Sequence, residues 1–153
     1  MQLRHRVFGK SATGFTLLEV LVALVVLSIG LLGLSGLQTS SLRNNHSAFL
    51  RSQATLAITD IMDRIRANSD AANAGDYDIA YDDSASETNC TSGCSPEAVA
   101  DTDLFEWRSY VERLPDGEGE IDVDANGVAE VKVRWADARD SGNKLEIITR
   151  SQI

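Results

Sequence analysis

One carboxylate stands inside a long apolar segment near the start of the chain. Glu19 is the only charged residue between Leu17 and Leu37. A charge at such a depth is costly in free energy unless a group of opposite charge pairs with it. In the first turns of this segment, the only such group is the amine that cleavage of the Gly14–Phe15 bond would release. We therefore expect Glu19 to pair with a buried ammonium. The alternative is that it lies shallow and reaches interfacial water.

The segment around this carboxylate is built like a membrane anchor. The run from Leu17 to Leu37 can cross about 30 Å of hydrocarbon at about 1.5 Å per residue. An ordinary secretory signal has a shorter apolar core, followed by a small-residue cleavage site that is missing here. Three basic and no acidic residues precede Gly14, so the net charge of −9 becomes −12 for the remainder. This asymmetry predicts a cytoplasmic leader and an exported body. Hydropathy alone leaves a plain signal anchor as the alternative.

The two cysteines, Cys90 and Cys94, lie in the part of the chain that is expected to be exported. An oxidising compartment favours a disulfide between them. Such a bond closes a small ring and stabilises by on the order of 2 kcal/mol in the chain-entropy model. A redox site is normally C-x-x-C, and a zinc site needs four ligands, whereas the histidines are limited to His5 and His46. We therefore expect a structural disulfide.

A second group of polar residues resembles the start of a calcium-binding loop. Asp122, Asp124, Asn126 and Gly127 follow the opening pattern of an EF-hand. That motif ends in a glutamate, and the corresponding position holds Val133. Asn-Gly is also the preferred two-residue turn of a β-hairpin. A hairpin turn is expected here, and a weak calcium site is the alternative.

Composition excludes several classes of function. The acidic balance argues against nucleic acid as a partner, because such proteins usually carry a basic patch. The sequence has no glycine-rich phosphate loop, no metal-ligand set and no Ser/His/Asp grouping. The aspartate-rich stretch over residues 68–95 is expected to be a solvated surface loop rather than a metal site. We predict no enzymatic activity and no cofactor.

Helical periodicity continues beyond the apolar run. Between Leu50 and Ile65, apolar residues recur on one face of a helix. No proline occurs before Pro96. The sequence therefore predicts one helix from about Phe15 to about Ala67. Its first half would lie in lipid and its second half against a head domain.

Three glycines, Gly30, Gly33 and Gly36, lie in the second half of the apolar run. Small residues of this kind allow close helix packing in membranes. The alternative is local melting of the helix on leaving lipid, because each glycine costs about 1 kcal/mol relative to alanine.

The sequence that follows the long helix predicts a small α+β head. Ser95 is a suitable N-cap and Pro96 a suitable first residue for a second helix. Over residues 121–135, apolar and polar side chains alternate on both sides of the Asn-Gly turn, which predicts a β-hairpin. The same alternation over residues 145–149 predicts a third strand. The expected fold is α+β, a long N-terminal helix with a small antiparallel sheet.

The start of the chain resembles the class III signal of type IV prepilins and pseudopilins. The matching residues are Gly14-Phe15-Thr16-Leu17-Leu18-Glu19, followed by Val20-Leu21-Val22-Ala23-Leu24. The resemblance implies that a membrane peptidase cuts after Gly14 and methylates the new amine of Phe15. It also implies that Glu19 faces the amine of a neighbouring subunit. The implied parts are a leader (1–14), a transmembrane and filament-core helix (15–38), and a periplasmic head (39–153) with the type IV pilin fold.

Features farther along resemble the minor pilins of type IV pili. They are Ser28-Ile29-Gly30-Leu31-Leu32-Gly33-Leu34-Ser35-Gly36-Leu37-Gln38, the asparagine-rich loop, Cys90 and Cys94 with Ser95-Pro96, and Asp103-Leu104-Phe105-Glu106-Trp107 before Leu114-Pro115. This resemblance implies a low-abundance subunit that helps prime pilus assembly and occupies the tip. The implied partners are other minor pilins, the major pilin, the prepilin peptidase and the inner membrane, with a large tip adhesin as a further candidate. After assembly the subunit would lie in the cell-surface pilus. The alternatives are a minor pseudopilin of a type II secretion system and a pilus-borne adhesin module.

Overall fold

The computed structural model describes residues 14–88, 93–137 and 142–153. The chain consists of two compact units, residues 1–41 and 42–153. Helix α1, Leu17–Ala67, contributes to both of them. Its observed bounds agree with the single long helix that the sequence predicts.

In the first unit, α1 is an apolar helix whose side chains are exposed along its length. The helix passes through Gly30, Gly33 and Gly36 without interruption. The hydroxyl of Ser28 donates to the carbonyl of Leu24 (2.7 Å), and Thr39 bonds in the same way to Ser35 (3.1 Å). These two hydroxyls are thereby satisfied within the helix itself, which is the arrangement that a hydrocarbon environment favours.

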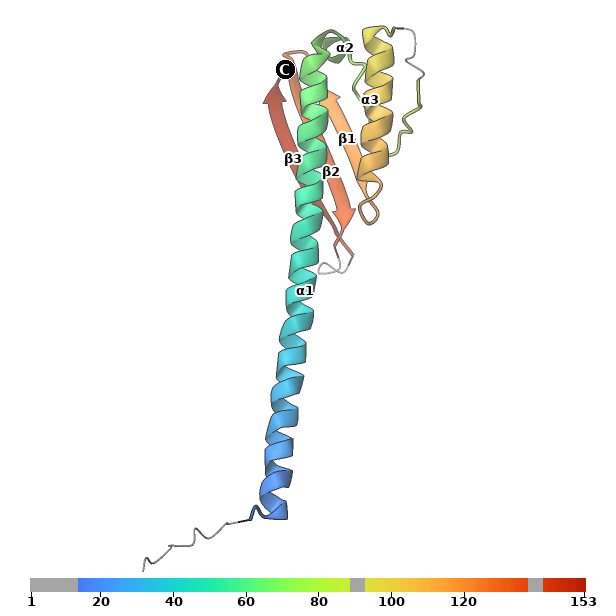
Figure 1. The fold of residues 1–153 in the computed structure, drawn as a ribbon. Coiled ribbons are helices and arrows are strands. Elements are labelled where there is room, and N and C mark those ends of the chain that lie inside the picture. The colour runs from blue at the N-terminus through green and yellow to red at the C-terminus, as the bar shows by residue number, and fades with distance from the viewer. Residues whose placement is uncertain (1–13, 89–92, 138–141) are drawn as a thin grey trace, which may run out of the picture. The chain divides into compact units, whose positions relative to one another are not determined.

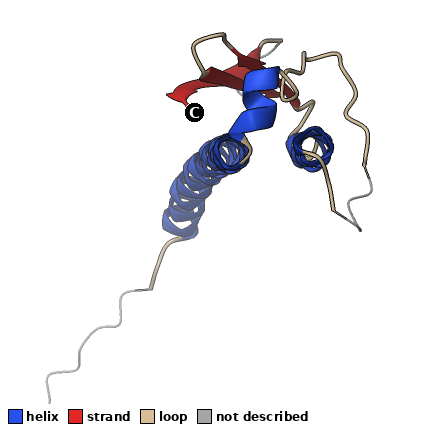
Figure 2. Cartoon of the chain, turned by 90° about the horizontal axis from the view of Figure 1, so that it is seen from above, coloured by secondary structure: helices blue, strands red, loops and turns tan. Residues whose placement is uncertain are grey.

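The second unit is a two-layer α+β head of helices and one sheet (Figure 1). Its elements are the head half of α1, α2 (Ser69–Ala74), α3 (Pro96–Val111), β1 (Glu118–Val123), β2 (Val128–Ala136) and β3 (Lys144–Gln152). The three strands form an antiparallel sheet in the order β1-β2-β3. Viewed from above, the two long helices, α1 and α3, lie on one side of the sheet (Figure 2). The predicted α+β fold, a long helix with a small antiparallel sheet, is confirmed.

The core of the head forms between the inner face of the sheet and the two long helices. Helix α1 buries Leu50, Ala54, Ala57, Ile58, Ile61 and Ile65, the face that the helical spacing predicts. Strand β2 buries every second residue, Ala129, Val131, Val133 and Trp135. The intervening residues of β2 are charged and lie on the outer face, where Lys132 pairs with Glu120 (2.5 Å) and Glu130 (2.9 Å). The strict alternation is what fixes the strand's register against the core.

Helix α3 begins as predicted, with Ser95 as N-cap accepting a hydrogen bond from the amide of Ala98 (3.2 Å). Its main anchor is Trp107, which is almost fully buried and donates from Nε1 to the carbonyl of Ala57 on α1 (3.1 Å). The indole also lies against Gly119 of β1. A Cβ added to Gly119 would lie 2.4 Å from Cη2 of this ring. The absence of a side chain at Gly119 therefore lets α3 approach the sheet closely.

The prediction that residues 68–95 form a surface loop is wrong for the first part of this range. Residues Ser69–Ala74 form α2, and the side chains of Tyr77 and Ile79 are buried in the core. Ile79 also pairs with Ile121 of β1 through two backbone hydrogen bonds of 3.0 and 2.9 Å. The physical reason is that two apolar residues in a polar stretch bury enough surface to hold the segment on the head.

Arg108 on α3 holds the next part of this segment. Its buried guanidinium donates to the carbonyl oxygens of Ala80 (2.8 Å), Tyr81 (3.2 Å) and Asp83, and to that of Gly119 on β1 (2.8 Å). One guanidinium has five N–H donors in a fixed plane, which suits several convergent acceptors. Arg108 therefore joins α3, β1 and the loop at one point.

Candidate processing and assembly site

The predicted cleavage bond lies just outside the first helical turn. Gly14, Phe15 and Thr16 precede α1 and are exposed, Phe15 by 82 %. A Cβ on Gly14 would meet nothing within 4 Å. Both residues of the Gly14–Phe15 bond thus lie outside the helix and are exposed.

Thr16 caps the helix that follows. Its hydroxyl accepts a hydrogen bond from the amide of Glu19 (3.3 Å), and its carbonyl accepts one from Val20 (3.3 Å). A threonine three residues before a glutamate is the sequence signature of a capping box. Sequence analysis missed this role, although the Thr-Leu-Leu-Glu spacing signals it. After cleavage, the new amine of Phe15 would stand one residue before the cap.

Glu19 lies in the first turn of α1, where the helix dipole favours a negative charge. It is exposed, and the side chains around it form an apolar concavity lined by Phe15, Val20, Ala23, Leu24 and Leu27. In the described part of the chain, no cationic side chain forms an ion pair with Glu19. The expected pairing of Glu19 with an ammonium of another subunit stays a prediction.

The cysteine prediction falls partly outside the described residues. Cys94 is described and is disulfide-bonded, whereas Cys90 lies outside the described residues. The specific Cys90–Cys94 pairing therefore stays a prediction.

Two residues of the alternative calcium loop, Asp124 and Asn126, are hydrogen-bonded within the hairpin turn. The carboxylate of Asp124 accepts hydrogen bonds from the amides of Asn126 (2.8 Å) and Val128 (2.9 Å). These bonds hold the pKa of Asp124 below its usual value, the bond from Val128 having the larger effect. Asp122 lies on β1 opposite Glu130. The geometry serves the turn, and within the described residues no cluster of three or more His, Cys, Asp or Glu side chains is arranged to bind a metal.

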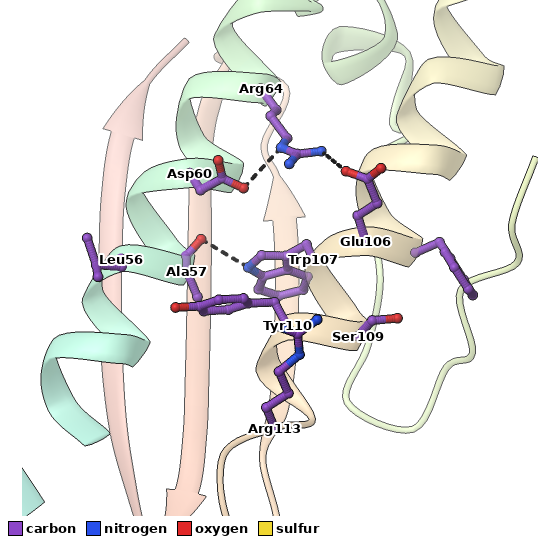
Figure 3. A pocket seen from close by; sticks show the side chains of 10 residues that line it. Leu56, Ala57, Asp60, Arg64, Glu106, Trp107, Ser109, Tyr110 and Arg113 are labelled. Carbon is purple, nitrogen blue, oxygen red and sulfur yellow. Dashed lines mark hydrogen bonds and ion pairs between the residues drawn. The ribbon is translucent and has the colours of Figure 1, made fainter. Parts of the chain in front are cut away.

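A groove between the head half of α1 and α3 was not foreseen from the sequence (Figure 3). At one end, Arg64 pairs with Asp60 (3.0 Å), Asp103 (3.0 Å) and Glu106 (2.6 Å). Asp103 also accepts a hydrogen bond from the hydroxyl of Tyr77 (2.6 Å). Burial and this bond raise the pKa of Tyr77 above its usual value. The network joins α1, α3 and the segment after α2.

Two family models match the chain. Residues 9–35 match the prokaryotic N-terminal methylation motif, and residues 36–105 match the domain described as type IV pilin Tt1218. The chain carries the signal and the domain of type IV pilins. The first match includes Glu19 and the bond at which cleavage is predicted, Gly14–Phe15. The second covers the head half of α1, α2 and α3 as far as Phe105, so the strands lie beyond it. No curated protein and no solved structure matches the chain.

These matches support a pilin role for the chain. The methylation motif implies processing by a prepilin peptidase and assembly with other pilins. Among the described residues, α1 is long and apolar enough to cross a membrane by length and composition, which fits membrane anchoring before assembly. Type IV pilins are structural proteins rather than enzymes, and the long helix with its small antiparallel sheet agrees with their fold.

Proposed function

We propose that the chain is a minor pilin of the PilV class, the type IV pilus modification proteins. One observation carries the proposal: a lone carboxylate, Glu19, stands on an exposed apolar helix and has no cationic partner among the described residues of its own chain. A second subunit whose N-terminal amine is buried beside Glu19 would supply that partner. Such a pair sets the register of neighbouring helices more than it stabilises them.

Before assembly, the subunit would span the inner membrane once with its head in the periplasm. Residues 1–14 would be removed as the leader, residues 15–38 would form the transmembrane and later filament-core helix, and residues 39–153 would form the head. The basic leader and acidic remainder support this orientation. The accessible bond before the Thr16 cap supports cleavage at Gly14–Phe15.

Within the pilus, the subunit would act in few copies at or near the tip. There it would prime assembly together with other minor pilins, contact the major pilin, and offer a place for a large tip adhesin. The loop, cysteine and Asp-Leu-Phe-Glu-Trp features of the head support the PilV class over other pilins.

The test is Glu19→Gln in a piliated strain. Insertion and leader cleavage should proceed normally, because removing a charge eases insertion. Incorporation should fail, because the partner ammonium stays buried without a counter-charge at a cost of roughly 3–5 kcal/mol. The expected result is few surface pili despite normal amounts of processed protein in the membrane.

Glu97→Gln is the matched control, since it neutralises an exposed carboxylate in the first turn of α3. It should leave piliation unchanged. Normal piliation with Glu19→Gln protein recovered in sheared pili at wild-type amounts would reject the assembly role of Glu19. Loss of type II secretion with normal piliation, on deleting the gene, would instead identify a pseudopilin.

A further inference from the structure

The two edges of the sheet are treated differently by the fold. At the β1 edge, Ile121 exchanges two backbone hydrogen bonds with Ile79 (3.0 and 2.9 Å). The next outward amide of this strand, that of Val123, donates to a carboxylate oxygen of Asp78 (2.9 Å). The segment that follows α2 therefore covers this edge and occupies its backbone groups.

Strand β3 forms the other edge, and this edge is open. The bond from the amide of Ile153 to the carbonyl of Gly127 (3.0 Å) shows that the odd-numbered residues of β3 bond to β2. The backbone groups of Glu146, Ile148 and Arg150 consequently point outward, because these directions alternate along a strand. None of these groups has a hydrogen-bond partner among the described residues. The nine-residue strand contains no proline and no bulge, two devices that commonly block an edge.

The outer face of β3 carries an apolar side chain between two opposite charges. Ile148 is 50 % exposed, more than any other large apolar side chain of the described head outside α1. Glu146 and Arg150 lie two residues to either side of it, on the same face. The hydroxyl of Tyr81 donates to Glu146 (2.6 Å), and Arg150 pairs with Glu130. A carboxylate and a guanidinium with one partner each can form further hydrogen bonds.

This arrangement is complementary to itself when two copies of β3 run antiparallel. In the register centred on Ile148, Glu146 lies opposite Arg150 of the second copy, and Ile148 lies opposite its own counterpart. The outward backbone groups of the three residues then face each other and form about six hydrogen bonds, two for each residue pair. A shift by two residues would instead place Arg150 opposite Lys144, or Ile148 opposite Arg150. Charge and backbone therefore select the same register.

We propose that the β3 edge pairs with the β3 edge of a second copy of this chain. The two sheets of three strands become one continuous sheet around a two-fold axis that passes beside Ile148. The backbone bonds supply the affinity and the facing side chains supply the specificity, as in other cases of strand addition. A second copy is the favoured occupant because β3 itself carries the charge pattern that the edge requires.

The symmetry decides which copies can meet. Figure 1 shows β3 running along the head half of α1 and in the same direction. The two-fold axis reverses β3, so it also sets the head halves of the two α1 helices antiparallel. Subunits of one filament share one orientation, so the pair joins heads that belong to different filaments. This last step rests on the proposed function, whereas the pairing of the two strands does not.

Disulfide trapping tests the pairing with the processed, full-length protein extracted in detergent. Ile148→Cys places two thiols opposite each other, with Cα atoms about 5.5 Å apart, which is within the range of a disulfide. Gln152→Cys is the matched control, because it is exposed on the same face of β3. Its two copies would lie about 27 Å apart along the pair. The expected result is a disulfide-linked dimer from position 148 and none from position 152.

A charge swap in the Ile148→Cys background tests the register. Arg150→Glu sets carboxylates opposite each other and should lower the yield of the dimer by about fivefold. Adding Glu146→Arg restores opposite charges in exchanged order and should restore the yield. Both variants lose the ion pair with Glu130, so a role of Arg150 within its own head alone would leave the second change without effect.

The step to different filaments is tested by culturing together two piliated strains whose Ile148→Cys proteins carry different epitope tags. Dimers that carry both tags are expected, and dimers confined to one tag would overturn contact between filaments. No dimer from position 148, equal dimers from both positions, or a charge swap that restores nothing would overturn the strand pairing itself. Absence of the protein from sheared pili, with the dimer still forming in detergent, would overturn the proposed function and leave the pairing in place.

Discussion

Replacing Gly119 with alanine should destabilise the head through one contact. The added Cβ would lie 2.4 Å from Cη2 of Trp107 and 3.0 Å from two further ring atoms. The indole cannot turn away freely, because it is almost fully buried and its Nε1 is bonded to Ala57 on α1. Either α3 or β1 must therefore shift.

The size of the effect follows from the two interactions at risk. Overpacking of a well-packed core costs about 1–3 kcal/mol, and weakening the hydrogen bond from Trp107 to Ala57 adds about 1 kcal/mol. The free energy of unfolding should therefore fall by about 2–4 kcal/mol. For a head of this size, the midpoint of thermal unfolding should drop by about 10 °C or more.

The assay is urea and thermal unfolding of the isolated head, residues 42–153, produced in an oxidising compartment and followed by tryptophan fluorescence. The control is the same glycine substitution in a Trp107→Phe background, where the ring atoms that overlap the new Cβ are missing. There Gly119→Ala should cost less than about 1 kcal/mol. A loss below about 0.5 kcal/mol in the wild-type background, or equal losses in both, would refute the reasoning.

Three further outcomes are expected. N-terminal sequencing of the membrane-extracted protein should begin at N-methylated Phe15, and an N-terminus at residue 1 or beyond residue 37 would contradict cleavage at the predicted bond. Reduction should raise the intact mass of the head by two hydrogens if Cys90 and Cys94 are paired, whereas two free thiols before reduction would disprove the pair. Hydrogen bonding, chiefly from Lys144, holds the pKa of Glu118 below its usual 4.5, so its contribution to stability is complete above about pH 4.5 and is lost as pH falls through the lowered value. Lys144→Met should reduce this loss, an effect below about 1 kcal/mol for a partly exposed surface pair. A dependence of the urea midpoint on pH between 6 and 3 that is the same as in the wild type would count against it.

The parts of the fold that were predictable from sequence are those set by local pattern. Apolar spacing along α1 gave its buried face, Ser95-Pro96 gave the start of α3, and alternation in β2 gave the hairpin. The signal around Gly14 and Glu19 was equally local, since a leader, a glycine and a lone carboxylate stand in fixed order within a few turns.

The contacts that were not predictable join residues far apart in the chain. Tyr77 and Ile79 lie in a polar stretch whose composition indicates a loop, and only their pairing partners on α3 and β1 show that they belong to the core. The sequence around Arg108 predicts only an exposed helical arginine. Its role depends on the loop carbonyls that the fold places around it. The groove likewise depends on how closely α3 approaches α1, a distance that Gly119 and Trp107 set together.

The internal hydroxyl bonds of the apolar helix bear on how a pilin changes its surroundings. Ser28 and Thr39 bond to carbonyls of the preceding turn, so these polar groups need nothing from lipid, water or a neighbour. A change of surroundings, from hydrocarbon to a protein interior, would therefore leave these two hydrogen bonds intact.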